Sequence, residues 1–331
     1  MSPNRKLVKV RPARPPELPG LARLLNGHLA DLMKSTPAGR PGPLQRHLDL
    51  LVRDRTLLLA IDQRKLSGLA ALDLDQARIM ALHLDPDRAS ATTTRDLLAA
   101  IEQTALDYGL QQLSCTVRPQ AWAFMERMGY EAVGLADESR PIELRKPLLA
   151  QASDAHIHLI ELHAELSIPA DYGVRHRLRV IEPAHSLAAA GLDMFGRETE
   201  LAPEAAEAWY RMRDAALEQD ISLQLVSGFR TVDYQAGLIR KKLNDGQPIE
   251  RILRVSAAPG YSEHHSGLAL DLGTPGTLPL DIQFADTRAY KWLCQHARIF
   301  GFRESYGQRN HHGIDWEPWH WCFTRFRAAS G

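Results

Sequence analysis

The sequence predicts two domains in succession, an α/β domain followed by an α+β domain. The chain has 331 residues, which is long for a single hydrophobic core. Strand-like and helix-like segments alternate over residues 1–150, which is typical of an α/β domain. Residues 171–331 combine amphipathic helices with short strands that carry polar motifs, and residues 151–170 are expected to connect the two parts.

The amino-acid composition and charge balance limit the classes of binding partner that are expected. Hydrophobic residues make up 44% and charged residues 24% of the chain, as in an ordinary soluble globular protein. Lys plus Arg and Asp plus Glu each number 40, so neither nucleic acid nor an anionic membrane is expected as the main partner.

Cysteine usage and the N-terminus indicate the compartment. Cys115, Cys294 and Cys322 form neither a CxxC pair nor a disulfide framework, which favours a reducing compartment. The N-terminus lacks the apolar stretch of a secretory signal, and no apolar run is long enough to span a membrane. We therefore expect a cytoplasmic protein.

The first domain is expected to begin with a strand at 7–11, a helix at 18–33 and a loop at 36–43. Apolar runs at 57–61 and 66–72 predict a hairpin around 62–65. Further along the chain we expect a strand ending near Leu84, a helix at 94–108, a strand at 113–117 and a helix at 121–128. Gly129 is a plausible C-cap of that last helix.

The closing segment of this domain, Ala121-Trp-Ala-Phe-Met-Glu-Arg-Met-Gly-Tyr130, resembles the helix-to-strand ending of GNAT acyltransferases. The resemblance implies a GNAT-like mixed sheet over residues 1–150. Members of that family cradle the cofactor pyrophosphate on a glycine-rich turn at a helix N-terminus. Residues 88–93 contain no glycine, and Met125 occupies the position of a tyrosine often used as general acid. We predict a degenerate domain kept for structure or contacts, with acetyl-CoA left open as a ligand.

The second domain is expected to contain a helix at 203–219, a strand at 223–227, a helix at 233–243 and a strand at 267–272. Pro203 suits the first turn of its helix. The connector carries three histidines, which are interpreted as solvated or partly buried side chains: His156, His158 and His163.

Two short segments of the second domain predict a zinc site. Alternation over 267–272 sends three leucines to the core and places Asp271, beside two small residues, on the opposite face. His264 precedes this strand, and His320 lies in a Trp-rich segment expected to be extended or turning. Two imidazoles and one carboxylate with an open fourth position are the ligands of a catalytic zinc ion. Glu317 would act as general base on the zinc-activated water.

Other side chains near these motifs could compete as ligands, namely Asp315, His265, His311 and His312. His311 and His312 lie in a polar loop and are better interpreted as rim residues.

The motifs resemble those of a peptidase family. The first is Ser262-x-His264-x-x-Gly267-x-Ala269-x-Asp271, and the second is Glu317-Pro318-Trp319-His320-Trp321. Together with residues 227–235 they make the segment 168–324 similar to the VanY-like D-alanyl-D-alanine carboxypeptidases of the LAS zinc peptidases. The resemblance implies a small antiparallel sheet with flanking helices.

The resemblance also implies roles for individual residues. The zinc ligands would be His264, Asp271 and His320, with Glu317 as base. Arg230 would hold the substrate or stabilise charge on the scissile carbonyl oxygen, a role that its donor fork suits. Gln235 and Ser262 would contact the terminal carboxylate of the peptide, or would satisfy local backbone groups instead. Trp319 is expected as a further peptide-binding residue. Phe229 and Thr231 replace the Tyr and Ser more usual beside the arginine.

The expected function is zinc-dependent removal of a C-terminal D-alanine from a short peptidoglycan-type peptide. In the cytoplasm such an enzyme would trim recycled muropeptides, precursors or a free dipeptide. D,D-carboxypeptidase, L,D-carboxypeptidase, dipeptidase and endopeptidase action stay open. An acyltransferase function of residues 1–150 and a non-catalytic cell-wall-peptide binding protein are the alternatives. Glu317 argues against the latter, because binding alone needs no base.

Overall fold

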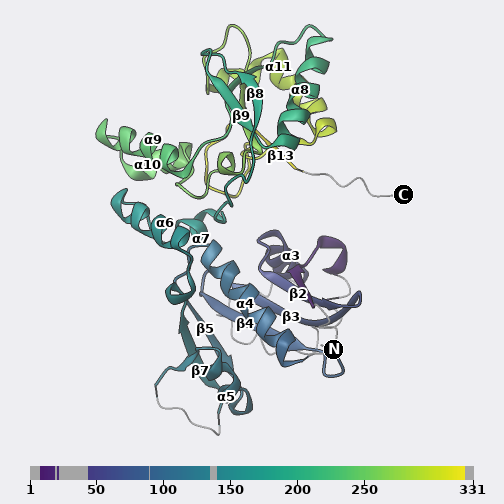
Figure 1. Ribbon diagram of the computed structural model, residues 1–331, viewed down its shortest axis with the longest axis vertical. Helices are drawn as coiled ribbons and strands as arrows, with labels where there is room; N and C mark the ends of the chain where they lie inside the picture. The colour runs from purple at the N-terminus through teal and green to yellow at the C-terminus, as the bar shows by residue number, and fades with distance from the viewer. Residues whose placement is uncertain (1–7, 19–20, 22–43, 89, 135–139, 325–331) are drawn as a thin grey trace. The chain divides into compact units, whose positions relative to one another are not determined.

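The computed structural model describes residues 8–18, 21, 44–88, 90–134 and 140–324 (Figure 1). The chain divides into two compact units, residues 1–157 and 158–331. The expected loop at 36–43, and nearly all of the expected helix at 18–33, lie outside the described residues.

The first unit contains a seven-stranded mixed sheet in the order β1-β2-β3-β4-β5-β7-β6. Strands β1 to β4 pair antiparallel, β4 pairs parallel with β5, and β7 pairs antiparallel with both β5 and β6. The predicted mixed-sheet fold class is confirmed by this topology. The strands are β1 (Lys9–Pro12), β2 (Leu57–Asp62), β3 (Lys65–Asp73), β4 (Arg78–Leu84), β5 (Gln112–Val117), β6 (Glu131–Ala132) and β7 (Ile142–Pro147).

Helix α4 packs against β2, β3 and β5 of this sheet (Figure 1). Its buried face includes Leu97, Leu98 and Ile101, at the spacing that predicted the helix. The C-cap of α5 (Pro119–Arg127) is Met128, one residue earlier than expected, and Gly129 follows it with a φ of +84°. The helices of this unit are η1 (Pro15–Glu17), α3 (Leu44–Arg53), α4 (Ala91–Asp107), α5 (Pro119–Arg127) and η2 (Leu149–Gln151).

An ion pair lies inside the first unit. Lys146 Nζ on β7 lies 2.9 Å from Glu102 Oε2 on α4, and both side chains are less than a tenth exposed. Tyr130 donates a hydrogen bond to the same carboxylate. Because a buried charge needs a partner, each member of this pair depends on the other.

Residues 151–170, expected as a connector, contain helix α6 (Asp154–Glu165). Leu159 and Leu162 form its buried face, at the i, i+3 spacing that brings side chains together on a helix. The side chain of His158 is 58% exposed, and His163 Nε2 lies 2.8 Å from Pro259 O.

The second unit contains a four-stranded antiparallel sheet in the order β10-β11-β13-β12 and a two-stranded sheet of β8 and β9. This confirms the predicted small antiparallel sheet with flanking helices. The strands are β8 (Ala188–Leu192), β9 (Glu198–Leu201), β10 (Gln224–Ser227), β11 (Ala269–Gly273), β12 (Phe302–Glu304) and β13 (His320–Phe323). The helices are α7 (Tyr172–His176), α8 (Pro203–Leu217), α9 (Val232–Asn244), α10 (Ile249–Val255), η3 (Glu263–Ser266), η4 (Ile282–Asp286), α11 (Arg288–His296) and η5 (Ala297–Phe300).

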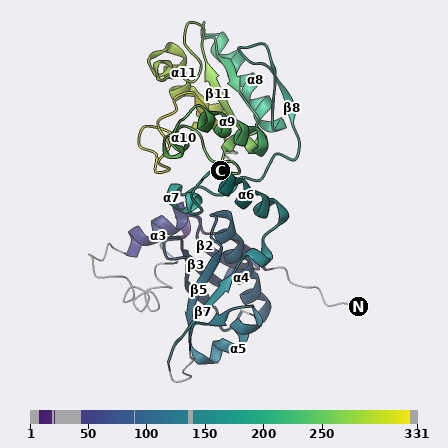
Figure 2. The ribbon, with the colours of Figure 1, turned by 90° about the vertical axis from the view of Figure 1, so that its left-hand side faces the viewer.

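One hydrophobic core joins α8 and α11 to the four-stranded sheet (Figure 2). This core includes Trp209 of α8, Trp292 of α11, and Leu270 and Leu272 of β11. Leu270 and Leu272 are at most 1% exposed, as predicted, whereas Leu268 precedes the strand and is only partly buried against this core. Within the described residues, no helix has both the length and the apolar character to cross a bilayer.

Candidate metal centre

Strand pairing places two of the predicted ligands side by side. Strands β11 and β13 run antiparallel with Asp271 directly opposite His320. Directly opposed residues of an antiparallel pair project their side chains on the same face, about 5 Å apart. The Trp-rich segment turns at Pro318 and Trp319 and becomes extended from His320 onward, and this extension creates the contact.

A short turn brings the third residue to the same point. His264 lies in η3, and Gly267 ends that helix at a φ of +68°. A Cβ at Gly267 would lie 2.8 Å from the backbone nitrogen of Ala202, so a side chain would be both strained and crowded there. The glycine therefore allows the chain to turn from η3 into β11.

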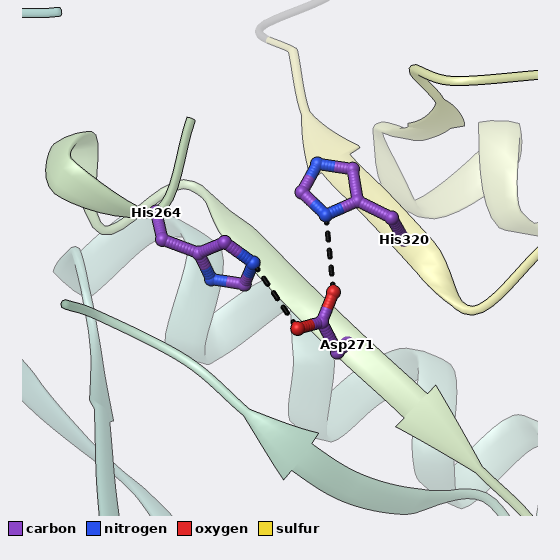
Figure 3. A group of neighbouring side chains, drawn as sticks. All are labelled: His264, Asp271 and His320. Carbon is purple, nitrogen blue, oxygen red and sulfur yellow. Dashed lines mark hydrogen bonds and ion pairs between the residues drawn. The ribbon is translucent and has the colours of Figure 1, made fainter. Parts of the chain in front are cut away.

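The three side chains form a compact, buried cluster (Figure 3). His264 Nε2 lies 3.2 Å from Asp271 Oδ2, and His320 Nδ1 lies 3.0 Å from Asp271 Oδ1. One ligand atom from each residue lies within 4.8 Å of the other two, and all three side chains are 3% exposed. Within the described part of the chain, no other group of three His, Cys, Asp or Glu residues meets this criterion.

The second nitrogen of each imidazole has a partner of its own. His264 Nδ1 lies 2.6 Å from Gly228 O, and His320 Nε2 lies 2.9 Å from Glu263 Oε2. A carbonyl oxygen only accepts, so His264 Nδ1 carries a hydrogen and donates it. This leaves His264 Nε2, the nitrogen that faces Asp271, with a free lone pair whenever the ring is neutral.

The electrostatics of the cluster favour a bound cation. Burial, followed by the charge of Arg230, lowers the pKa of His264 to about 4, so this ring is neutral at pH 7. Burial acts to raise the pKa of Asp271, but its interactions with His264, Arg230 and His320 hold it well below its usual range. Burial acts to lower the pKa of His320, whereas the carboxylates of Asp271 and Glu263 raise it to about 10. The field of two carboxylates that favours positive charge at His320 also attracts a divalent ion.

Arg230 contacts the cluster directly. Its Nε donates to Ser227 Oγ at 2.9 Å, and its Nη2 donates to the Asp271 carboxylate. The side chain is 15% exposed. The guanidinium thus places fixed donors beside the three clustered residues.

Glu317 lies in the turn that precedes β13. Its carbonyl accepts a hydrogen bond from His320 N at 3.0 Å. Burial raises the pKa of Glu317 to about 7, and the negative charge of Asp271 adds to the rise. The positive charges of His320, Arg230 and Lys242 act in the opposite direction. A carboxyl group with a pKa near 7 is suited to accept and return a proton at neutral pH.

The competing ligands have other contacts. His265 Nδ1 lies 2.8 Å from Arg230 O, and its Nε2 accepts from Gly260 N at 3.0 Å. Asp315 accepts from Arg254, and His312 Nδ1 lies 2.9 Å from His176 O. The ring of His311 lies against that of His312, with 4.0 Å between centroids. The structure groups none of these four with the cluster.

The three predicted peptide-contacting residues are buried or partly buried. Gln235 is 1% exposed, and its Nε2 donates to Ala257 O at 2.8 Å. Ser262 is 4% exposed, directly before η3. Trp319 is partly buried against the hydrophobic core.

The cluster fits zinc by the chemistry of its donors. Two imidazole nitrogens and one carboxylate oxygen are a recurrent ligand set of catalytic zinc sites, where the fourth position stays open. Both rings are also oriented by hydrogen bonds at the opposite nitrogen, as is usual for metal-binding histidines.

Four residues around the cluster were not predicted. Ser227 and Gly228 orient Arg230 and His264, and Glu263 contacts His320. Lys242 lies close enough for its charge to lower the pKa of Glu317. Glu263 had a detectable signal, since it is an acidic residue inside the Ser-x-His motif. Gly228 makes its contact through the backbone carbonyl. Every residue has such a carbonyl, so the identity of the residue does not predict the contact.

Comparison with known proteins places this unit among peptidases. Residues 198–326 match the VanY family, described as D-alanyl-D-alanine carboxypeptidase. VanXYC of Enterococcus gallinarum, a bifunctional D-Ala-D-Ala dipeptidase and D-Ala-D-Ala carboxypeptidase, is 34% identical over 149 residues, which cover 43% of this chain and 75% of that protein. YodJ of Bacillus subtilis is 33% identical over 131 residues, 38% of this chain, and the match spans about half (47%) of YodJ.

Two solved structures also resemble the chain. The LdcB LD-carboxypeptidase is 27% identical with a TM-score of 0.40, over 43% of this chain and 69% of that one. N-acetylglutamate synthase of Neisseria gonorrhoeae is 17% identical with a TM-score of 0.33, over 44% of this chain and 36% of that one. No residue role follows from either likeness.

Proposed function

The chain belongs to the VanY family of D-alanyl-D-alanine carboxypeptidases, and on this premise we propose that it is a zinc-dependent carboxypeptidase acting on short peptidoglycan-type peptides. The observation that carries the proposal is the buried cluster of His264, Asp271 and His320 with Glu317 beside it. The cluster supplies a three-residue metal site, and Glu317 supplies a base with a matching pKa.

In this proposal His264, Asp271 and His320 hold the zinc ion. Zinc, when bound, supplies Lewis-acid activation of water and of the scissile carbonyl. Glu317 accepts the proton of the attacking water and returns it to the leaving amine, so one carboxylate serves as base and then as acid. Such a group contributes about 10²- to 10⁴-fold to the rate.

Arg230 is assigned to the substrate side of the site. Its guanidinium presents several donors in a fixed plane. It would donate to the substrate carbonyl oxygen as negative charge develops there. Gln235, Ser262 and Trp319 are proposed to shape the peptide pocket, with Gln235 acting through the Ala257 backbone that it holds.

The proposal is tested by following D-alanine release from three substrates. Zinc-loaded protein is incubated with a muramyl pentapeptide, a muramyl tetrapeptide and free D-alanyl-D-alanine. Parallel samples contain excess chelator or the Glu317→Gln variant. We expect release that is lost in both controls.

The substrate pattern identifies the activity. Release from the pentapeptide alone supports D,D-carboxypeptidase action, whereas release from the tetrapeptide supports L,D-cleavage. Release from the free dipeptide supports the additional activity for which VanXYC is named. Absence of zinc-dependent release from all three refutes the proposed function.

A further inference from the structure

Glu263 is a second acidic residue beside the proposed ligands, and its position is unspecified in the Ser-x-His motif. It opens η3, one residue before His264. Its Oε2 lies 2.9 Å from His320 Nε2, although 57 residues separate the two in the chain. The side chain of Glu263 is 17% exposed and that of His320 is 3% exposed. The contact is therefore largely shielded from water.

The imidazole of His320 lies between two carboxylates. Its Nδ1 lies 3.0 Å from Asp271 Oδ1, and its Nε2 lies 2.9 Å from Glu263 Oε2. A neutral imidazole carries a hydrogen on one nitrogen and a lone pair on the other. A metal shared with Asp271 needs the lone pair on Nδ1. The hydrogen then lies on Nε2, where Glu263 accepts it.

We propose that Glu263 is a positioning residue that accepts a hydrogen bond from His320 Nε2 and so presents Nδ1 to the metal. This inference rests on the proposed zinc site. Glu263 stands at a position where the motif specifies no residue type, and its proposed role is to orient His320. Glu263 itself does not touch the metal or the substrate.

The surroundings of Glu263 support this role. Arg303 of β12 lies 3.4 Å from Glu263 Oε1, which leaves Oε2 for His320. Strand β12 pairs with β13, and Arg303 lies opposite Cys322, two residues after His320. The ring of Tyr306 lies against His320 with 4.9 Å between centroids. The carboxylate and the ring are thus held by elements that pack together.

The geometry also excludes Glu263 as a fourth ligand in this arrangement. It contacts the nitrogen of His320 that points away from Asp271, so the imidazole ring separates the two carboxylates. Among the described residues, the set of convergent ligand atoms contains His264, Asp271 and His320 and omits Glu263.

Loss of such a partner typically weakens metal affinity by about 10- to 100-fold. Glu263→Ala removes the acceptor and should show the full effect. Glu263→Gln keeps an oxygen acceptor without the charge, so we expect an intermediate loss. Glu182→Ala is the matched control, because the side chain of Glu182 is 79% exposed and pairs with His185, which is 84% exposed. We expect wild-type zinc affinity for this control.

The experiment measures the zinc dissociation constants of the wild-type chain and the three variants by competition with a chromophoric chelator. Thermal melting of each metal-free protein checks folding. In zinc-loaded samples, ¹⁵N NMR of the imidazoles reports which nitrogen of His320 carries the hydrogen. We expect hydrogen on Nε2 in the wild type and a weaker affinity in the order wild type, Glu263→Gln, Glu263→Ala.

The outcomes separate this inference from the proposed function. If folded Glu263 variants bind zinc within twofold of the wild type, or if His320 carries its hydrogen on Nδ1, the positioning role is wrong while the zinc site stands. If Glu263→Ala does not fold, the Glu263→Gln affinity decides in the same way. If the wild type binds no zinc, the proposed function fails and this inference fails with it.

Discussion

Replacement of Gly228 by alanine should disturb the metal centre through the backbone alone. Gly228 follows β10, and its carbonyl accepts the hydrogen bond of His264 Nδ1 at 2.6 Å. A Cβ at this position would lie 2.6 Å from Glu200 O and 2.6 Å from Thr199 Cγ2. The Glu200 carbonyl is itself hydrogen-bonded to Phe229 N at 2.9 Å, so it cannot move freely. The peptide at Gly228 has to shift instead.

The size of the effect follows from these contacts. Forcing an extra methyl group into a packed site costs about 1–3 kcal/mol of stability. Displacing the acceptor of a metal-binding histidine typically weakens metal affinity by about 10- to 100-fold, which corresponds to about 1.4–2.8 kcal/mol. We therefore expect Gly228→Ala to lower both the melting temperature and the zinc affinity.

Gly237→Ala is the matched control, since the substitution is chemically identical and lies in the same unit. No heavy atom lies within 4 Å of a Cβ placed at Gly237, which is exposed on α9. Alanine in a helix interior is more favourable than glycine by about 1 kcal/mol. We expect unchanged zinc affinity and equal or higher stability. Wild-type zinc affinity in folded Gly228→Ala, or equal weakening in both variants, would refute the reasoning.

Three further predictions concern charged residues. Arg230→Lys replaces a planar donor fork by a point charge, and we expect kcat/KM to fall about 10²-fold. Lys146→Met leaves Glu102 buried without its partner, and denaturant unfolding should show a loss of about 3–5 kcal/mol with unchanged zinc affinity. In metal-free protein, ¹³C NMR should show Glu317 titrating with a pKa of about 7. Lys242→Met should raise that pKa further, because the positive charge of Lys242 lowers it.

Each of these substitutions has a control at an exposed position. Arg213→Lys changes an arginine that pairs with Asp214 on the surface of α8, and kcat/KM should not change. Lys65→Met and Lys241→Met alter exposed lysines and should leave stability and the pKa of Glu317 as they are. A drop in kcat/KM for Arg213→Lys equal to that of Arg230→Lys would contradict the role given to Arg230. An unchanged Glu317 pKa in Lys242→Met would contradict the charge interaction.

Regular elements were predictable where burial imposes a period on the sequence. The hairpin of β2 and β3, helix α4 and strand β11 all follow apolar spacings that one face or both faces of the element require. The GNAT resemblance predicted the mixed sheet of the first unit, and the parallel pairing of β4 with β5 confirms it. The buried ion pair of Lys146 and Glu102 was not predicted, because the two residues lie 44 positions apart in the sequence and only the fold brings them together.

The proposed ligands were predictable because short local elements set their spacing. Only seven positions separate His264 from Asp271, and the Gly267 turn followed by an alternating strand brings both to one point. His320 required one further inference, that the Trp-rich segment is extended or turning instead of helical. Its pairing opposite Asp271 is a matter of register, which a single sequence does not reveal.

The two hydrogen bonds that orient the proposed histidine ligands place different constraints on the sequence. His264 is oriented by the Gly228 carbonyl and His320 by the Glu263 carboxylate, so different ring nitrogens face Asp271. Every residue has a backbone carbonyl, so position 228 is constrained by backbone shape and the space for a Cβ. Position 263 is constrained by side-chain chemistry, because only an acceptor of suitable length reaches His320. The two positions should therefore respond differently to substitution: any side chain at 228 should weaken zinc binding, whereas glutamine at 263 should retain part of it.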